Sequence, residues 1–371
     1  MKNLFNNLKK YPLLVFFAVV LYVLSIADLF SPQYEFSDLE NRDLATFPAF
    51  SLKTLVNNEY TPKIEDFTED HFIKRNSWIS LKSICETVLG KGENNGIVYG
   101  EDGYQFTKVL STDQTQRLKN ISAVAAFIQN NPDVNIKFLL APTAPSVMTD
   151  KVKPGSPVNN AEGVITQLEE LIGSENVVDV RDTLKAHSDE YIYYRTDHHW
   201  TTLGAYYSYE QLMDTLGRNH TSIDNYTMID VEDFLGTHYS KSKTYNVQAD
   251  TLSYIDIEAD IVINDVAASI YEKEKLDVRD KYAMFTRGNP GYATIKGNGE
   301  GKIMILKDSY ANCMIPFMVA DFGEIHIFDM RYITMGLDQF IAEHDYDEIL
   351  FLYNCETFLS DKDLVKINMF N

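Results

Sequence analysis

An aspartate and a histidine two positions apart are the most chemically suggestive feature of this sequence. Asp197 and His199 lie in the run YYRTDHHW, residues 193–200. In an extended or turn conformation, side chains two residues apart share a face, so the Asp197 carboxylate can orient the His199 imidazole. His198 then points elsewhere. This spacing suits a histidine general base with an orienting acid.

A serine at the end of a β-strand is the second such feature. The run ILKDSYAN, residues 305–312, predicts a strand that ends and turns into a helix at Ser309. A serine there is exposed at the carboxyl end of the strand, and the helix N-terminus offers unpaired N–H groups to a developing oxyanion. The geometry resembles a nucleophile elbow without its G-x-S-x-G sequence. Ser309 is therefore the candidate nucleophile.

Each of these residues also has a different explanation. Serine is a common N-cap, so Ser309, like Asp308, could simply cap its helix. Asp197 and His199 could form a structural hydrogen-bonded pair. Metal binding is the third alternative, but the adjacent His198 and His199 do not easily reach one ion, and no H-E-x-x-H motif completes a site. We therefore expect neither a metal nor another cofactor.

The elements that must position these residues alternate between strands and helices. Strands are expected at residues 135–140, 177–180, 302–306, 324–328 and 348–353, and helices at residues 164–172 and 310–320. Such alternation is typical of an α/β fold in which helices cover both faces of a parallel sheet. Ligand chemistry in that architecture belongs at the carboxyl ends of the strands.

Other regions depart from that rhythm. Residues 61–89 predict a helical stretch, residues 96–106 predict a hairpin, and the polar, tyrosine-containing residues 216–296 predict a β-rich insertion beside the site. The expected organisation is a membrane anchor or signal sequence at residues 1–30, a stalk and helical region at 31–94, and a catalytic domain at 95–371 with an insertion at about 216–296.

The N-terminal segment carries no charge over residues 11–27, and three lysines among residues 2–10 precede it. Extended to Phe30, it has about the twenty residues needed to span a bilayer. The basic flank predicts a cytoplasmic N-terminus and a body outside the cell. The alternative is a cleaved signal peptide, because Ser25 and Ala27 have the spacing of a cleavage site. We expect a single-pass membrane protein with an extracytoplasmic catalytic domain.

The composition excludes several classes of protein. The chain of 371 residues has 33 Lys and Arg against 54 Asp and Glu, and a net charge of −21 would repel nucleic acid. Its three cysteines, Cys85, Cys313 and Cys355, are too few for a disulfide scaffold and lack the spacing of a zinc site. A bridge between Cys313 and Cys355 is an alternative, but we expect two buried thiols.

The order of several short motifs resembles the DHHW family, within the alginate O-acetyltransferase-like group of SGNH hydrolase proteins. The motifs are ENRDLA at 40–45 with Phe47-Pro48, the hairpin at 96–106, DHHW at 197–200, FLGT at 234–237, KDSYAN at 307–312 and DMRY at 329–332. In this group the Asp-x-His element precedes the serine, as it does here. The resemblance implies a flavodoxin-like core, with Asp197 as orienting acid, His199 as general base and Ser309 as nucleophile.

The oxyanion and substrate sites are less well defined. Counterparts of the usual SGNH glycine and asparagine donors are not evident, so the candidates are the N–H groups of Ser309 and Tyr310. Asn354, just past a strand end, is a third candidate, and a loop cap is its alternative. Arg331 and Tyr332 are candidate contacts for an acceptor sugar, with a salt bridge and a packing role as alternatives.

The function that the resemblance implies is acyl transfer, O-acetylation in particular, to hydroxyls of a cell-surface polysaccharide through an acyl-serine intermediate. An exported transferase needs a relay for acyl groups made inside the cell, and the resemblance suggests a membrane-bound O-acyltransferase partner. A carbohydrate esterase (deacetylase) of the same fold needs no such partner. A non-catalytic polysaccharide-binding protein, with tyrosines stacked on sugar rings, is the third alternative.

Overall fold

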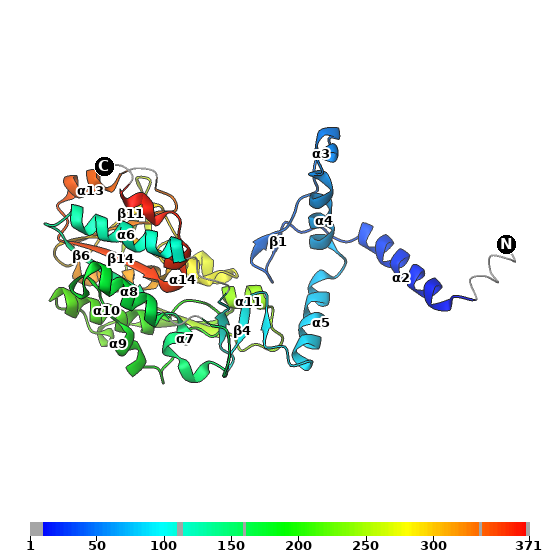
Figure 1. Cartoon of the computed structure of the whole chain (residues 1–371), viewed down its shortest axis with the longest axis horizontal. Coiled ribbons are helices and arrows are strands. Elements are labelled where there is room, and N and C mark those ends of the chain that lie inside the picture. The colour runs from blue at the N-terminus through cyan, green and yellow to red at the C-terminus, as the bar shows by residue number, and fades with distance from the viewer. Residues whose placement is uncertain (1–9, 110–113, 159–160, 334–335, 369–371) are drawn as a thin grey trace. The chain divides into compact units, whose positions relative to one another are not determined.

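The computed structural model describes residues 10–109, 114–158, 161–333 and 336–368 (Figure 1). The chain divides into two compact units. One comprises Met1–Lys91 together with Lys243–Tyr245, and the other comprises Gly92–Ser242 and Asn246–Asn371. All the candidate site residues belong to the second unit.

Within its described residues, the second unit is built on a seven-stranded sheet in the order β10-β9-β11-β13-β12-β14-β6. The parallel part consists of β13 (Glu324–Phe328), β12 (Lys302–Lys307), β14 (Glu348–Asn354) and β6 (Asn135–Ala141). The antiparallel part consists of β11 (Tyr292–Lys296), β9 (Asp260–Ile263) and β10 (Val266–Ser269). The sheet is therefore mixed.

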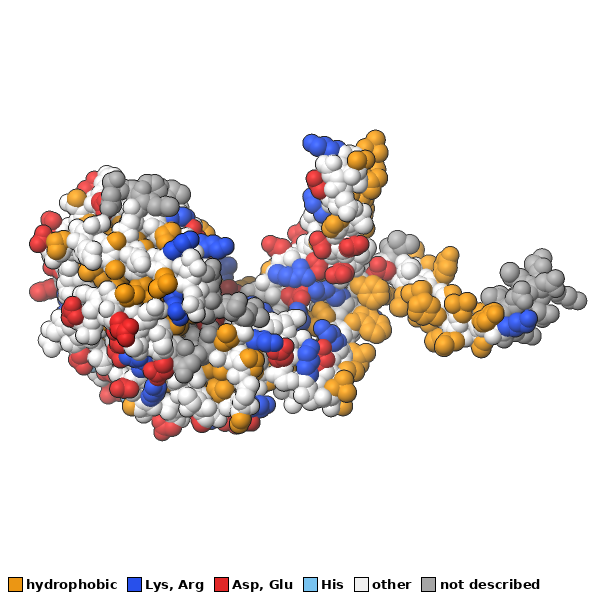
Figure 2. All heavy atoms as spheres, viewed as in Figure 1, with side chains coloured by type: hydrophobic (Ala, Val, Ile, Leu, Met, Phe, Trp, Pro, Cys, Tyr) orange, Lys and Arg blue, Asp and Glu red, His pale blue; other side chains and the backbone are white. Residues whose placement is uncertain are grey.

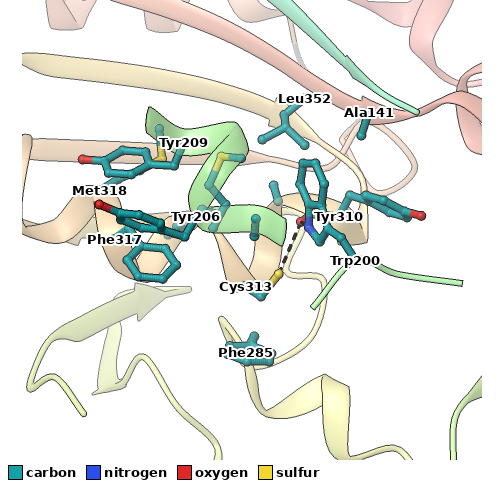
Figure 3. Close-up of a cluster of buried hydrophobic side chains, with 14 of the residues drawn as sticks. Ala141, Trp200, Tyr206, Tyr209, Phe285, Tyr310, Cys313, Phe317, Met318 and Leu352 are labelled. Carbon is teal, nitrogen blue, oxygen red and sulfur yellow. Dashed lines mark hydrogen bonds between the residues drawn. The ribbon is translucent and has the colours of Figure 1, made fainter. Parts of the chain in front are cut away.

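Both faces of the sheet are covered by helices. On β12, Ile303 and Ile305 join one buried cluster and Met304 and Leu306 join the other, as the two-residue period of a strand requires. The first cluster includes α10 (Thr202–Leu216) and α12 (Ile315–Asp321), and Figure 3 shows Tyr206 and Tyr209 beside Phe317 there. The second includes α6 (Gln114–Asn130), α8 (Glu162–Ile172), α13 (Leu337–His344) and α14 (Cys355–Ser360). The expected α/β layering is confirmed.

Shorter elements complete the second unit. Its remaining strands are β3 (Glu93–Asn94), β4 (Ile97–Tyr99), β5 (Gln105–Thr107), β7 (Met228–Phe234) and β8 (Asp250–Ile255). Its remaining helices are α7 (Ala144–Val147), α9 (Arg181–Ala186) and α11 (Thr237–Ser242), with 3-10 turns at Thr149–Lys151, Ser174–Asn176, Ile223–Asn225, Lys273–Asp277, Lys281–Met284, Ser309–Cys313 and Leu364–Asn368. The antiparallel pairing of β4 with β5 confirms the expected hairpin.

Three expectations about these elements need correction. Residues 177–180 do not form a strand, because Val177 makes only an isolated bridge to Phe138 and α9 begins directly afterwards. The helix expected at 310–320 begins as a 3-10 turn, since Pro316 can occupy only the first turn of α12. The sheet is not parallel throughout, because β11 from the β-rich insertion pairs antiparallel with β13 and brings β9 and β10 with it.

The first unit contains α2 (Pro12–Leu29), β1 (Phe36–Ser37), β2 (Arg42–Asp43), α3 (Leu52–Val56), α4 (Tyr60–His71) and α5 (Arg75–Val88). The expected helical stretch is broken between α4 and α5, where Lys74 has a φ of 54°. Arg42 of the ENRDLA motif donates to Asp70 at 2.9 Å, and Glu40 pairs with Arg75 and Lys243. This motif therefore ties the extended segment to the helices.

The uncharged N-terminal segment forms α2. Among the described residues, no helix is both long enough and apolar enough to cross a membrane. The membrane anchor stays a prediction, and Lys2 and Lys9 of its basic flank lie outside the described residues. The expectation for the cysteines is confirmed, because Cys313 and Cys355 are buried free thiols.

Candidate active site

Ser309 follows β12, which lies between β13 and β14, in a short segment, residues 307–313, that we call the serine arm. Asp308 caps the 3-10 turn, because its Oδ1 accepts the Tyr310 N–H at 2.9 Å. Its Oδ2 accepts the Asn354 N–H at 2.8 Å, which ties the arm to the end of β14. Since Asp308 is the cap, the Ser309 hydroxyl is not needed for that role.

Asp197 and His199 lie in a tight loop, residues 193–200, that we call the histidine arm. Its ends are joined by an isolated antiparallel bridge between Tyr193 and Trp200. The Trp200 ring N–H donates to the Tyr310 carbonyl at 3.0 Å, and Figure 3 shows the two aromatic side chains together. The histidine arm is thereby held against the serine arm.

The two arms bring Asp197, His199 and Ser309 into a continuous hydrogen-bonded chain. His199 Nδ1 lies 2.6 Å from Asp197 Oδ1, and His199 Nε2 lies 2.8 Å from Ser309 Oγ. Asp197 and His199 are buried and Ser309 is half-buried. A carboxylate accepts only, so Nδ1 carries the proton and Nε2 is left to accept from the serine hydroxyl. This is the geometry of a serine nucleophile with its base.

The charge state of Asp197 fits that role. Burial opposes its ionisation, but the His198 and His199 imidazoles and the Thr237 N–H, which donates to Oδ2 at 2.7 Å, hold the pKa of Asp197 well below its usual range. The carboxylate is therefore ionised at neutral pH and can stabilise an imidazolium that forms beside it.

His198 points away from the serine, as expected. Its Nδ1 lies 2.7 Å from the Thr237 hydroxyl, and burial together with His199 lowers the pKa of His198 to about 4. One ligand atom from each of Asp197, His198 and His199 lies within 4.8 Å of the others. Both nitrogens of His199 are already engaged in hydrogen bonds, so this arrangement fits proton transfer better than metal binding.

Comparison with known proteins identifies the family of this chain. The model of the family described as DHHW protein matches residues 91–328. The chain belongs to the DHHW family. The resemblance inferred from its short motifs is thereby confirmed. A comparison with curated proteins gave no match.

Solved structures show that this DHHW chain shares its fold with bacterial proteins. A DHHW family protein from Eubacterium siraeum has a TM-score of 0.66 and 23% identity, over 75% of this chain and 97% of that one. PatB1 from Bacillus cereus has a TM-score of 0.59 and 18% identity, over 73% and 99%. The same protein with a sulfonyl adduct has a TM-score of 0.60 and 20% identity, over 73% and 97%.

The FLGT motif of the DHHW chain has a structural role that the sequence did not reveal. Gly236 lies so close to Asp197 that an added Cβ would be 2.3 Å from the Asp197 Cβ and Oδ2 atoms. Thr237 supplies the N–H that binds the same carboxylate, and the Gly236 N–H donates to the Thr196 hydroxyl at 3.0 Å. Only a residue without a side chain fits at position 236.

Asp250, at the start of β8, is the second residue that sequence reasoning missed. Its fully buried carboxylate accepts the Arg195 N–H at 2.9 Å and the Thr196 N–H and hydroxyl at 2.8 and 2.6 Å. The Tyr191 hydroxyl also donates to it. Asp250 therefore organises the backbone that leads into the histidine arm. No local pattern around position 250 indicates this role.

The candidate oxyanion donors are not equivalent. The Tyr310 N–H is already bound to Asp308, so it is not a free donor in this structure. Ser309 is the first residue of its turn, a position whose N–H has no partner within the helix. Asn354 Oδ1 accepts the Glu356 N–H at 2.8 Å, which is the loop cap considered above. Because this bond uses only Oδ1, the amide N–H groups of Asn354 remain the candidate oxyanion donors of this side chain.

Arg331 and Tyr332 follow the end of β13. Arg331 Nε donates to Asp329 Oδ1 at 2.8 Å, so the salt-bridge alternative is observed. Tyr332 is 62% exposed. A role for either residue in binding a sugar stays a prediction.

Lys307 is the first residue of the serine arm and is almost fully buried. Its Nζ donates to Asn312 Oδ1 at 2.7 Å and to Asn289 Oδ1 at 3.2 Å. Burial lowers the pKa of Lys307 to about 8, although Asp329 and Asp308 oppose the shift. The lysine thus links the end of β12 to the loop that precedes β11.

Proposed function

We propose that this protein is an O-acyltransferase that forms an acyl-serine at Ser309 and passes the acyl group, acetyl in particular, to a hydroxyl of a cell-surface polysaccharide. The observation that carries the proposal is the hydrogen-bonded chain from Asp197 through His199 to Ser309. Membership of the DHHW family supports the choice of acyl transfer. The resemblance of the sequence motifs to alginate O-acetyltransferase-like proteins supports it too.

The reaction has two steps. His199 Nε2 takes the proton from Ser309 Oγ as the oxygen attacks the carbonyl carbon of an acyl ester, and the departing alcohol receives that proton. A sugar hydroxyl, whose proton His199 removes, then attacks the acyl-serine. The bond between Ser309 Oγ and the acyl carbon breaks, and Oγ takes the proton back from His199. The Ser309 N–H and the Asn354 amide are the proposed donors to the oxyanion that forms in each step.

The test is mass spectrometry of the purified protein incubated with 4-nitrophenyl acetate. We expect the peptide that contains Ser309 to gain the mass of one acetyl group. The Ser309→Ala variant loses this adduct, whereas Ser80→Ala, which removes an exposed serine of the first unit, keeps it. Oligosaccharides added to the acylated enzyme are then analysed for acetyl groups.

The outcomes separate the alternatives. Acetyl groups on the oligosaccharide support the transferase. Release only to water at every acceptor tested would favour a carbohydrate esterase. A folded protein that forms no adduct with 4-nitrophenyl acetate or with a sulfonyl fluoride would overturn the catalytic proposal and favour a polysaccharide-binding protein.

The location is a second part of the proposal. We propose that the N-terminal segment carries the second unit to the outside of the cell and keeps it at the membrane, where a membrane-bound O-acyltransferase supplies acyl groups. The uncharged residues 11–27 support this, and hydrophobic side chains cover α2 (Figure 2). Protease added to intact cells should degrade the second unit, and resistance without lysis would contradict export.

A further inference from the structure

A tyrosine from the insertion lies against the candidate general base. Tyr282, in the 3-10 turn Lys281–Met284, stacks on the His199 ring with 3.8 Å between ring centroids and 12° between ring planes. The Tyr282 hydroxyl donates to the Ser309 carbonyl oxygen at 3.1 Å. One buried side chain therefore contacts both the imidazole and the backbone of the serine.

Tyr282 is itself held firmly. The Phe285 ring packs against it at 5.3 Å and the Tyr194 ring contacts it edge-on at 6.5 Å. The Cys313 thiol lies 3.3 Å from its hydroxyl oxygen. Burial raises the pKa of Tyr282 well above its ordinary value, so the hydroxyl remains a neutral donor at every pH of interest.

The stacked geometry favours one charge state of the imidazole. The face of an aromatic ring is electronegative and attracts a cation more strongly than a neutral ring. An imidazolium forms at His199 when Ser309 gives up its proton, so this attraction grows as the reaction proceeds. The other ionisable neighbours of His199 are the Asp197 carboxylate and the rings of His198 and Tyr310, and Asp280 lies two residues before Tyr282.

We propose that Tyr282 is a positioning residue for this reaction, which fixes the plane of the His199 imidazole and stabilises its protonated form through the face of its ring. The inference rests on the proposed acyl transfer. It assigns a role in the chemistry to the β-rich insertion, since neither arm contains a group that stacks on His199 in this way.

Two variants separate the ring from the hydroxyl. Tyr282→Phe keeps the stack and loses the contacts of the hydroxyl with the Ser309 carbonyl and the Cys313 thiol, whereas Tyr282→Leu removes the aromatic face. Tyr271→Leu is the matched control, because Tyr271 is a buried tyrosine of the same insertion whose hydroxyl donates to the Ile255 carbonyl at 2.9 Å. Tyr271 has no ring contact with His199 among the described residues.

The first measurement is kcat/KM for 4-nitrophenyl acetate as a function of pH. Loss of the aromatic face makes the imidazole harder to protonate, so the acid limb of the Tyr282→Leu profile should move to lower pH by about half to one unit. The same loss should reduce kcat by about 5- to 30-fold. Tyr282→Phe should keep the acid limb at the pH of the wild type and keep most of kcat. Tyr271→Leu should also leave the acid limb in place.

The second measurement does not depend on activity. The His199 ring signal is assigned in the NMR spectrum by comparison with His199→Asn, and its titration is followed in each variant. A lower titration midpoint in folded Tyr282→Leu, with Tyr282→Phe like the wild type, is the expected result. An unchanged midpoint in Tyr282→Leu, or an equal change in Tyr282→Phe, would overturn the inference. If the midpoint is lower in Tyr282→Leu but the wild type forms no acyl-serine, the proposed function alone is refuted.

Discussion

The serine arm and the histidine arm are hydrogen-bonded to each other but are built in different ways. The serine arm continues β12, and its cap, Asp308, is the residue next to Ser309. The histidine arm has a single isolated bridge and otherwise depends on groups far away in the sequence. Those groups include Asp250, Gly236, Thr237 and Tyr282 from the β-rich insertion.

This difference indicates what the insertion is for. Ordering a loop costs roughly 1–2 kcal/mol per residue in conformational entropy, and a loop without a ladder of backbone hydrogen bonds must offset that cost by other contacts. In the histidine arm, buried carboxylates accept the backbone N–H groups of Arg195, Thr196 and His199. The end of β12 thus positions the nucleophile, and contacts from the insertion order the loop that carries the base.

The largest effect expected from breaking the histidine arm comes from Gly236→Ala. The added methyl group would lie 2.3 Å from atoms of Asp197, a short side chain whose oxygens are already engaged, so the carboxylate must move away from His199. Displacement of an orienting acid should lower kcat/KM by about 100-fold or more. The assay is hydrolysis of 4-nitrophenyl acetate.

Gly163→Ala is the matched control for this substitution. Gly163 lies on α8, and an added Cβ there meets no atom within 4 Å. We expect unchanged activity and an increase in stability of about 0.5–1 kcal/mol, because alanine favours a helix. Activity within 3-fold of the wild type in Gly236→Ala would show that the close approach to Asp197 does not matter.

The serine arm was predictable because its signals are local. Residues 303–306 form an apolar run, and the lysine, aspartate and serine that follow mark its end, so the strand, a cap and the position of the hydroxyl at the strand end can all be inferred within ten residues of Ser309. The pair Asp197 and His199 was also inferred from spacing alone. What connects these two segments in space was supplied by the resemblance to the family.

The residues that support the histidine arm were not predictable, because their contacts with it are not local. Asp250 and Tyr282 act across 54 and 83 positions of sequence, and neither lies in a pattern that differs from an ordinary loop. The antiparallel extension of the sheet was missed because β11 pairs with β13 across a long connection, which leaves no periodic signal. The expected strand at 177–180 was wrong because four apolar and polar residues suit a bridge as well as a strand.

A comparison of Asp250→Asn with Asp308→Asn tests how far the two arms differ. Both substitutions keep the size of the side chain and replace one accepting oxygen with an NH2 group, which cannot accept a hydrogen bond from a backbone N–H. This change should cost about 1–3 kcal/mol in the free energy of unfolding. We expect Asp250→Asn to lower kcat/KM by about 10- to 30-fold and Asp308→Asn by about 3-fold, because β12 still directs the serine arm.

Urea denaturation and kcat/KM are both needed for this comparison. Equal losses of stability with unequal losses of activity would support the different construction of the arms. If Asp308→Asn lowers activity as much as Asp250→Asn, the serine arm depends on its cap as strongly as the histidine arm depends on Asp250, and the contrast between them fails.

The smallest effect concerns Lys307, the buried first residue of the serine arm. The pKa of Lys307 is about 8 in the folded protein and about 10.4 in an unfolded chain. Between these values the unfolded state binds more protons, so this residue makes the free energy of unfolding rise with pH. Relative to Lys307→Met, the wild type should gain about 1 kcal/mol between pH 8 and pH 9.

Urea denaturation of both proteins at the two pH values measures that gain, because other titrating groups cancel in the difference. Lys119→Met, which removes an exposed lysine of α6, is the control and should show no such gain. A burial-driven shift requires that water does not reach Nζ, and the Lys307 side chain is almost fully buried and bonded to Asn289 and Asn312. If the gain is absent, Lys307 is hydrated or stays charged, and the serine arm is then packed no more tightly than the histidine arm that it faces.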